Sequence, residues 1–199
     1  MKKKLLLFVL LSCYIFGNIS NTRYGPGLDI GSKGSGVFFN YLVGNNQKNL
    51  DLLCELRYFD IKGETESIVY DYWTNQYVTI SGQNLILIPI LVGVNYHPFA
   101  GQIANNFSPF ITIRGGTNLA IDGKEGDESY KQKWSKAKTH WSMAGFIGAG
   151  IEFRWYNQSS IALHIGSDIL KLSQKADEKD DYSGLLIHIS FNKFIKKDY

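Results

Sequence analysis

The stretch LDLLCELRY, residues 50–58, alternates in polarity almost without interruption. Successive side chains of a β-strand point to opposite faces, so a period of two sorts such residues into two rows. A helix would mix the same residues around its axis. The pattern therefore predicts a strand with an apolar and a charged face. One face carries Leu50, Leu52, Cys54, Leu56 and Tyr58, and the other carries Asp51, Leu53, Glu55 and Arg57.

Other segments show the same period, and none shows a sustained helical pattern. The residues at 85–96 are apolar on both faces at the start, which leaves the orientation of that strand open. Clusters of Gly, Asn, Asp and Lys separate the segments, as is typical of turns. Together they predict an all-β chain of eight antiparallel strands, at 27–31, 37–43, 50–58, 85–96, 110–119, 142–156, 160–171 and 185–192.

The predicted connections differ in length in a regular way. If both chain ends lie on one side of the sheet, the first, third, fifth and seventh connections lie on the other. Three of those four, residues 62–84, 122–138 and 173–181, are long or charged. Short turns on one side and longer loops on the other are typical of small up-and-down barrels of bacterial outer membranes.

The first twenty residues have the features of an export signal. Lys2, Lys3 and Lys4 form a positive start, and an apolar stretch and smaller or polar residues follow. We therefore predict a cleaved signal peptide over 1–20 and a single barrel domain over 21–199. Two alternatives stay open: an uncleaved anchor, and a lipidated Cys13 within a sequence that resembles a lipobox. If Cys13 leaves with the leader, Cys54 has no disulfide partner.

Composition excludes several classes of function. The formal net charge of +3 includes the three lysines of the leader, so the mature chain is close to neutral. A nucleic-acid-binding protein usually carries a basic stripe, and none is visible here. The four histidines fall on separate segments, and no cysteine pattern suggests a metal. We therefore expect no metal, no cofactor and no nucleic-acid partner.

The rows of the strands allow two kinds of barrel. In a membrane barrel the apolar rows meet lipid and the charged rows face the interior, whereas a soluble barrel has the opposite arrangement. Aromatic residues near the ends of the apolar rows favour the membrane, because such rings prefer its interfaces. A soluble periplasmic, lipocalin-like barrel that binds an apolar ligand remains the alternative.

If the charged rows face inward, they form a polar network in the lumen. We interpret this network as a salt-bridged plug, because an unpaired charge in a dry interior is costly; a narrow ion path is the alternative. Glu152 and Arg154 are expected beside His164 and Asp168, and those beside His188. The predicted members are Asp51, Glu55, Arg57, Arg114, Glu152, Arg154, His164, Asp168 and His188.

Catalysis is not expected, although one set of residues suggests it at first sight. A lipid A-modifying enzyme with a nucleophilic serine would need a histidine and a carboxylate beside it. His164, Ser167 and Asp168 are close in sequence, but a separation of three residues puts Ser167 and His164 on opposite faces. We therefore predict no catalytic residue and a non-enzymatic protein, with the lipid A-modifying enzyme as a further alternative.

The leader, the eight strands and the last strand together resemble the small outer-membrane β-barrel superfamily typified by OmpA and OmpX. In the closing-strand signal of these proteins a polar or aromatic residue precedes a glycine, and alternating hydrophobic residues end in an aromatic one. The chain departs from this pattern by continuing past the final aromatic residue to Tyr199. The matching residues are Tyr182, Gly184, Ile187, Ile189 and Phe191.

This resemblance implies a Gram-negative cell envelope protein of the outer membrane, in contact with lipid and lipopolysaccharide. It also implies insertion by the barrel assembly machinery and a structural or surface-interaction role. Two outer connections are candidate contact surfaces for a partner: 62–84, which is rich in aromatic residues, and 122–138, which is rich in charge.

Overall fold

The computed structural model describes residues 21–45, 49–62, 67–80, 84–99, 102–103, 106–123, 137–155, 158–176 and 179–195. The predicted signal peptide, with Cys13, lies outside these residues, and so does most of the connection 122–138. Among the residues described, no helix has the length and apolar character needed to cross a bilayer.

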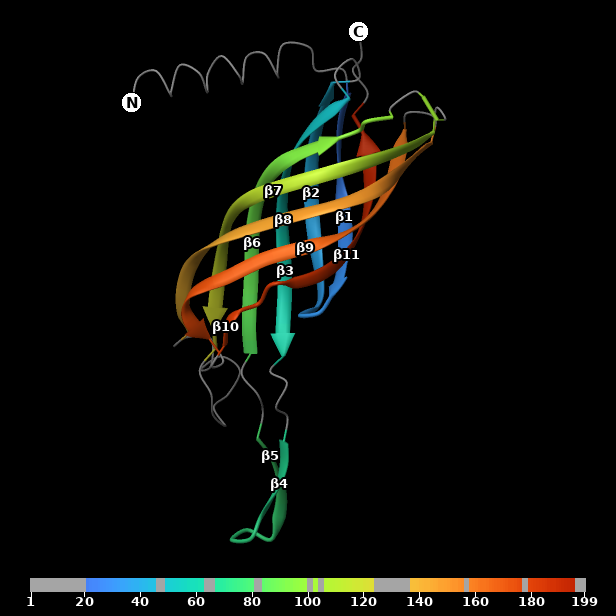
Figure 1. The fold of residues 1–199 in the computed structure, drawn as a ribbon. Helices are drawn as coiled ribbons and strands as arrows, with labels where there is room; N and C mark the ends of the chain where they lie inside the picture. Colours follow the sequence, from blue (N-terminus) through green and yellow to red (C-terminus); the bar gives the residue numbers. More distant parts are fainter. Residues whose placement is uncertain are drawn as a thin grey trace, which may run out of the picture.

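Eight strands form the wall of a closed barrel (Figure 1). Each pairs antiparallel with the next wall strand along the chain, and β11 returns to pair with β1, with Leu28 opposite Ile189. The wall strands are β1 (Asn21–Gly31), β2 (Gly34–Asn45), β3 (Leu50–Lys62), β6 (Asn84–Tyr96), β7 (Phe107–Asp122), β8 (Lys138–Trp155), β9 (Ser159–Ala176) and β11 (Gly184–Phe194).

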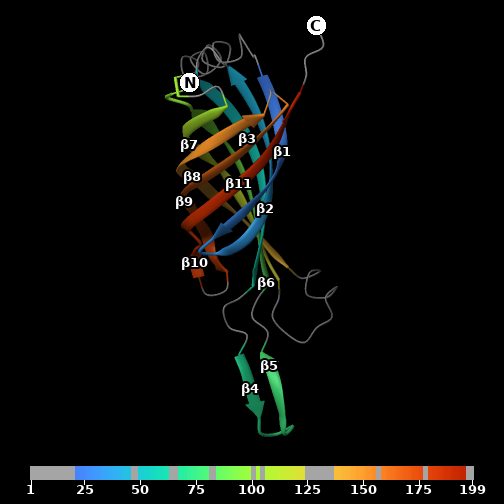
Figure 2. The ribbon, with the colours of Figure 1, turned by 90° about the vertical axis from the view of Figure 1, so that its right-hand side faces the viewer.

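Three further strands lie at or beyond one end of the wall. β4 (Ser67–Asp71) and β5 (Gln76–Ile80) pair with each other as a separate hairpin between β3 and β6. The short β10 (Lys179–Asp181) pairs with the end of β9. Figures 1 and 2 show the β4–β5 hairpin projecting well beyond the barrel.

The prediction of eight antiparallel barrel strands is confirmed, although most strands are longer than predicted. The strand predicted at 27–31 begins at Asn21, and the strand predicted at 160–171 runs to Ala176. The expectation of a connection over 173–181 is therefore partly wrong. The reason is that Leu172 continues the buried row of β9, and Ser173 Oγ donates a hydrogen bond to the carbonyl of Trp141 on β8, at 3.0 Å.

The two ends of the barrel are different. At one end the start and finish of the described chain meet, where the Ile195 N–H donates to the Thr22 carbonyl at 2.8 Å. We call this the terminal end. The opposite end, from which the β4–β5 hairpin projects, is the hairpin end (Figure 1). The connections β1–β2, β3–β6, β7–β8 and β9–β11 all lie there, in agreement with the predicted alternation of sides.

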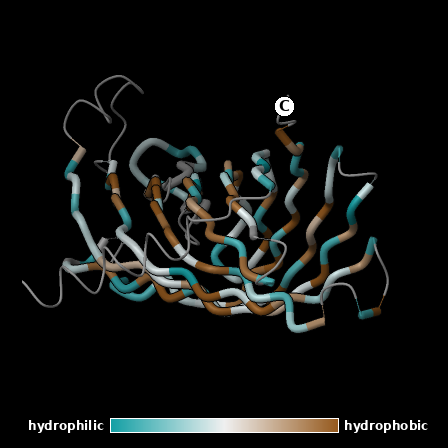
Figure 3. Tube along the Cα trace, turned by 90° about the horizontal axis from the view of Figure 1, so that it is seen from above, coloured by the Kyte–Doolittle hydropathy of each residue, from teal (hydrophilic) through white to brown (hydrophobic). Residues whose placement is uncertain are grey.

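Along the wall strands, residues alternate between the interior and the outside. In β1 every second residue is buried, and the residues between them are exposed. Figure 3 shows the corresponding alternation of hydrophilic and hydrophobic positions along the strands. The open orientation of β6 is also settled: Leu87 and Leu91 face inward, whereas Ile90 and Val92 face outward. Both rows are apolar in the first half of β6 because the inward row packs against other apolar side chains in the lumen.

Candidate functional site in the barrel lumen

Charged side chains from several strands meet in the middle of the lumen, with Glu55 at their centre. Arg57 Nε donates to Glu55 Oε1 at 2.5 Å, and Arg114 Nη1 donates to Glu55 Oε2 at 2.6 Å. His188 Nε2 lies 3.1 Å from the same Oε2. These residues come from β3, β7 and β11, so the contacts cross the lumen and tie its walls together.

The remaining contacts extend this group toward the hairpin end. Arg57 Nη1 donates to Asp168 Oδ1 at 2.9 Å, and Lys33, from the β1–β2 turn, pairs with the same carboxylate. Asp29 pairs with His188 Nδ1 and lies 3.8 Å from Arg57 Nε. Three carboxylates thus face three Lys or Arg side chains, which balances their charge. We call this set the central cluster: Asp29, Lys33, Glu55, Arg57, Arg114, His164, Asp168 and His188.

The two histidines of the central cluster pack against each other and against aromatic rings. Their ring centroids are 4.1 Å apart, and His188 stacks on Phe38 at 3.7 Å. Arg114 Nη2 lies 2.8 Å from His164 Nε2. Because a guanidinium group can only donate, His164 Nε2 must accept, which assigns its proton to Nδ1. That Nδ1 has no hydrogen-bond partner among the described residues.

A second group of charges lies nearer the terminal end. Arg23 bonds to Asp51 at 2.5 Å and its Nε lies 3.1 Å from Glu152. Arg154 Nη2 also pairs with Glu152, at 2.8 Å. His97 lies between two partners, with its Nε2 3.0 Å from Asp51 Oδ2 and its Nδ1 2.8 Å from Ser108 Oγ. Two arginines again balance two carboxylates. We call Arg23, Asp51, His97, Glu152 and Arg154 the terminal cluster.

The terminal cluster contains a group of potential metal ligands. Atoms of Asp51, His97 and Glu152 lie within 4.8 Å of one another, and all three residues are buried. However, the Arg23 guanidinium contacts both carboxylates. A cation is therefore already present among these ligands, and a metal ion would have to displace it. The arrangement fits a neutralised ion-pair network better than a metal centre.

Apolar side chains fill the lumen at the hairpin end. Phe146 lies at their border with the central cluster, since the guanidinium carbons of Arg57 and Arg114 are each 5.0 Å from its ring centroid. We call this group the apolar plug: Phe59, Leu85, Leu87, Leu91, Ala120, Ala144, Phe146, Leu170, Leu172, Tyr182 and Leu186.

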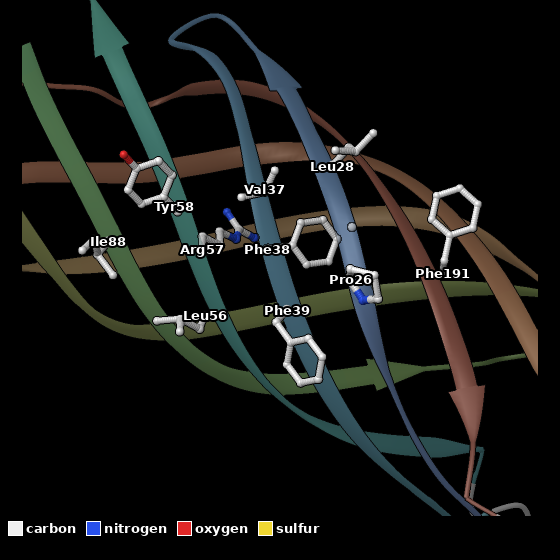
Figure 4. Close-up of a pocket in the computed structure, with 11 residues that line it drawn as sticks. Pro26, Leu28, Val37, Phe38, Phe39, Leu56, Arg57, Tyr58, Ile88 and Phe191 are labelled. Carbon is white, nitrogen blue, oxygen red and sulfur yellow. The ribbon is translucent and has the colours of Figure 1, made fainter.

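Among the described residues, one small space lies within the lumen and a larger one on the outer wall. The inner space, lined by Asn40, Asn95 and Phe110 among others, has room for about one water molecule. A much larger recess of about 590 Å³ lies on the outer wall, where outward-facing side chains such as Leu28, Phe39 and Tyr58 surround it (Figure 4). The larger of these two spaces is thus on the outside of the wall, not along the barrel axis.

The nine residues predicted for the polar network all face the interior. Eight are buried and Arg154 is half-buried. They separate into the two clusters, so the expectation that Glu152 and Arg154 lie beside His164 and Asp168 is wrong. The strand register is the reason, because it pairs Glu152 with Ala162 and Arg154 with Ser160. His164 and His188 do face each other, as expected.

Four members of the clusters were not among the predicted residues: Arg23, Asp29, Lys33 and His97. Arg23 and Asp29 share one row of β1 with Gly25 and Gly27, and glycines give no polarity signal. His97 follows Asn95 by two residues, so extending the row of β6 would have found it. No periodic signal could have indicated Lys33, because it lies in a turn and reaches the lumen only through its long side chain.

The serine considered for catalysis lies outside the lumen. Ser167 is exposed on the outer face of β9, whereas His164 and Asp168 are buried inside. The residues of the predicted closing-strand signal lie in two different places. Ile187 and Phe191 face outward on β11, and Tyr182 lies just before the strand, buried in the apolar plug. Their role in assembly stays a prediction.

The aromatic segment within residues 62–84 forms the β4–β5 hairpin. At its turn, Asp71 accepts hydrogen bonds from the Trp73 backbone N–H at 2.9 Å and from Thr74 Oγ1 at 2.8 Å. These bonds, chiefly that from the Trp73 backbone, hold the pKa of Asp71 below its ordinary value. Tyr70 Oη also lies 2.5 Å from Asn75 Oδ1, and Asn75 takes a left-handed backbone conformation that suits a turn.

These observations define the class of protein: a closed eight-stranded antiparallel barrel with a charged, filled interior. Comparisons with protein-family models and with curated proteins find no match. Among solved structures, Neisserial surface protein A has the same fold, with a TM-score of 0.52 and 11% identity, over 89% of this chain and 95% of that one. A major outer membrane protein from Thermus thermophilus has a TM-score of 0.53 and 10% identity, over 87% and 99%. The fold is therefore that of the small outer-membrane barrels.

Proposed function

We propose that this protein is an integral outer-membrane barrel with a side-chain-filled, closed lumen and a structural or surface-interaction role without catalysis. The observation that carries the proposal is the distribution of polarity. The buried rows hold the charges, whereas the outer rows hold large apolar residues such as Leu28, Ile113 and Ile165, each about half exposed. This arrangement fits a barrel whose outside meets lipid, and it is the opposite of a soluble barrel.

Aromatic side chains support a membrane interface at the terminal end. They occur on the outer face around much of the barrel, and Phe107 packs edge-on against Phe153 at 5.1 Å. The hairpin end of the wall has fewer outward-facing aromatic residues, chiefly Tyr58 and Trp141. The terminal-end girdle comprises Tyr24, Tyr41, Tyr96, Phe107, Phe153, Trp155 and Phe191.

This distribution also weighs against the alternative functions. A soluble barrel that carries an apolar ligand needs an apolar cavity inside, and here two ion-pair clusters and the apolar plug occupy that space. A lipid A-modifying enzyme needs a serine, a histidine and a carboxylate on one face, which Ser167, His164 and Asp168 do not share. Ser108, His97 and Asp51 do meet on the inner face, where His97 Nδ1 lies 2.8 Å from Ser108 Oγ and Nε2 lies 3.0 Å from Asp51 Oδ2. These three residues are buried in the lumen, where a lipid outside the wall does not reach them, and Arg23 also holds Asp51. We further infer that the termini face the periplasm and that β11 carries the signal for the assembly machinery.

Membrane insertion can be tested with the tryptophans of the chain. We expect variants that retain one tryptophan each to differ after reconstitution in vesicles of brominated phospholipid. Trp155 belongs to the outward girdle, so its fluorescence should be quenched by bromine on the acyl chains. Trp73, at the tip of the hairpin, should keep most of its fluorescence.

Migration on an unboiled gel serves as the control for folding in both variants. Equal quenching of Trp73 and Trp155 would contradict the proposed orientation. A Trp155 that is not quenched in a folded sample, or a protein recovered from the soluble periplasm, would contradict insertion altogether.

The closed lumen gives a second expectation. In planar bilayers the protein should show no steady conductance of the size of a general porin, because charged clusters and apolar side chains fill the lumen. Substitution of Trp155 by phenylalanine, on the outer wall, serves as a control that should leave the record unchanged. A steady, large conductance in the native protein would overturn the closed lumen and favour the ion-path alternative.

A further inference from the structure

The tip of the β4–β5 hairpin presents aromatic rings to water. Tyr72 is 87% exposed, Trp73 is 97% exposed and Tyr77 is 75% exposed. Exposing several large rings together is unfavourable for a surface that touches only solvent. The tip is also carried away from the barrel wall by the hairpin (Figures 1 and 2). These rings therefore lie where a partner outside the membrane could reach them.

The tyrosine rings of the tip, and the turn that carries Trp73, are held in place before any partner arrives. Tyr70 and Tyr77 are directly opposite each other in the β-ladder, and Tyr70 meets both Tyr72 and Tyr77 edge-on, with centroids 5.1 Å apart in each pair. The Asp71 hydrogen bonds described above fix the turn that carries Trp73. Tyrosine rings and a turn that are ordered beforehand lose little conformational entropy on binding, which favours affinity.

The charge of the tip restricts what it can bind. Between Tyr70 and Tyr77 the only ionisable group other than the tyrosines is Asp71, and both of its oxygens accept hydrogen bonds within the turn. The other polar side chains, Thr74, Asn75 and Gln76, are neutral and exposed. This stretch has no lysine or arginine, which a surface that docks on anionic lipid or sulfated sugar would need.

We propose that the hairpin tip is a binding surface for neutral oligosaccharides outside the cell. A sugar ring offers a face of C–H groups that stacks on the electron-rich face of Trp or Tyr. Its hydroxyl groups suit the amides of Asn75 and Gln76 at the rim of the stack. This inference deepens the proposed surface-interaction role and rests on it, because the tip must lie on the outer side of the membrane.

The test uses the full mature chain in phospholipid nanodiscs, titrated with chitohexaose and cellohexaose as neutral probes and hyaluronan hexasaccharide as an anionic one. Saturation-transfer NMR and calorimetry report binding. We expect saturable binding of at least one neutral probe. Replacing Trp73 or Tyr72 by alanine should weaken it about tenfold or more. Trp141→Ala, which removes an exposed ring from the barrel wall, is the matched control and should bind as the native protein does.

Two results with the sugars would overturn the inference: no neutral probe binds, whether or not the anionic one does, or Trp73→Ala binds as well as the native chain. Association of the tip with sugar-free phosphatidylcholine vesicles would instead assign it to a lipid surface and likewise overturn the inference. Every sample is first tested for heat-modifiable migration and fluorescence quenching by brominated lipid. Failure of those tests rejects the membrane barrel, whereas failure of sugar binding in a sample that passes them rejects only the oligosaccharide surface.

Discussion

Replacing Arg57 by methionine is expected to lower the free energy of unfolding by about 3–5 kcal/mol. The Arg57 side chain is 0% exposed and bonds to both Glu55 and Asp168. Methionine fills similar space without a charge, so it leaves these two carboxylates with fewer cations in a dry interior. The loss should appear as a lower urea midpoint for unfolding from lipid vesicles, followed by tryptophan fluorescence.

Two variants provide controls for this prediction. Arg154→Met removes a side chain that is 22% exposed, and its partner Glu152 keeps Arg23, so a loss below about 1 kcal/mol is expected. The double substitution Arg57→Met with Asp168→Asn restores the balance of charge and should recover part of the loss. An Arg57→Met protein as stable as Arg154→Met would show that the central cluster does not stabilise the barrel.

Replacing Gly25 by valine is expected to prevent most molecules in a refolding sample from closing into a barrel. A Cβ atom at this position would lie 1.7 Å from the carbonyl oxygen of Phe191. That oxygen belongs to the backbone of β11, which pairs with β1 to close the barrel, so no side-chain rotation can relieve the contact. Overpacking usually costs about 1–3 kcal/mol, and a clash with backbone at the closing seam should exceed that range.

The matched control is Gly115→Ala on β7, where a Cβ would meet no atom within 4 Å. The fraction of chain that migrates as the compact, heat-modifiable form measures closure after refolding into vesicles. We expect it to fall sharply for Gly25→Val and to stay at the native level for Gly115→Ala. A native level for both would mean that the β1–β11 seam can shift to admit a side chain.

Much of this architecture is visible in the sequence because burial in a strand repeats every two residues. The row of β3 that holds Asp51, Glu55 and Arg57 is recognisable without any knowledge of its neighbours. Glycine-rich β1 shows where such reading weakens. Two of its four buried positions are Gly25 and Gly27, which are neither polar nor apolar enough to reveal an alternation. Arg23 and Asp29 are therefore hard to recognise as members of one inward row.

The partners across the lumen could not be predicted in the same way. Glu152 is expected beside His164 from strand order alone, but the β8–β9 register places it opposite Ala162, within reach of Arg23. Register depends on hydrogen bonds between strands and on the stagger that closes the barrel, neither of which is written in one segment. A displacement along a strand is therefore enough to separate the charges into two clusters.

The alternation that begins with LDLLCELRY by itself determined the eight strands, their two rows and the sides of their connections, because strand geometry acts over neighbouring residues. Only the tertiary structure decided which row lies inside, how Glu55 gathers Arg57, Arg114 and His188, and how the apolar plug fills one end. Those features depend on curvature and closure, which bring together side chains from β3, β7 and β11 that lie far apart along the chain.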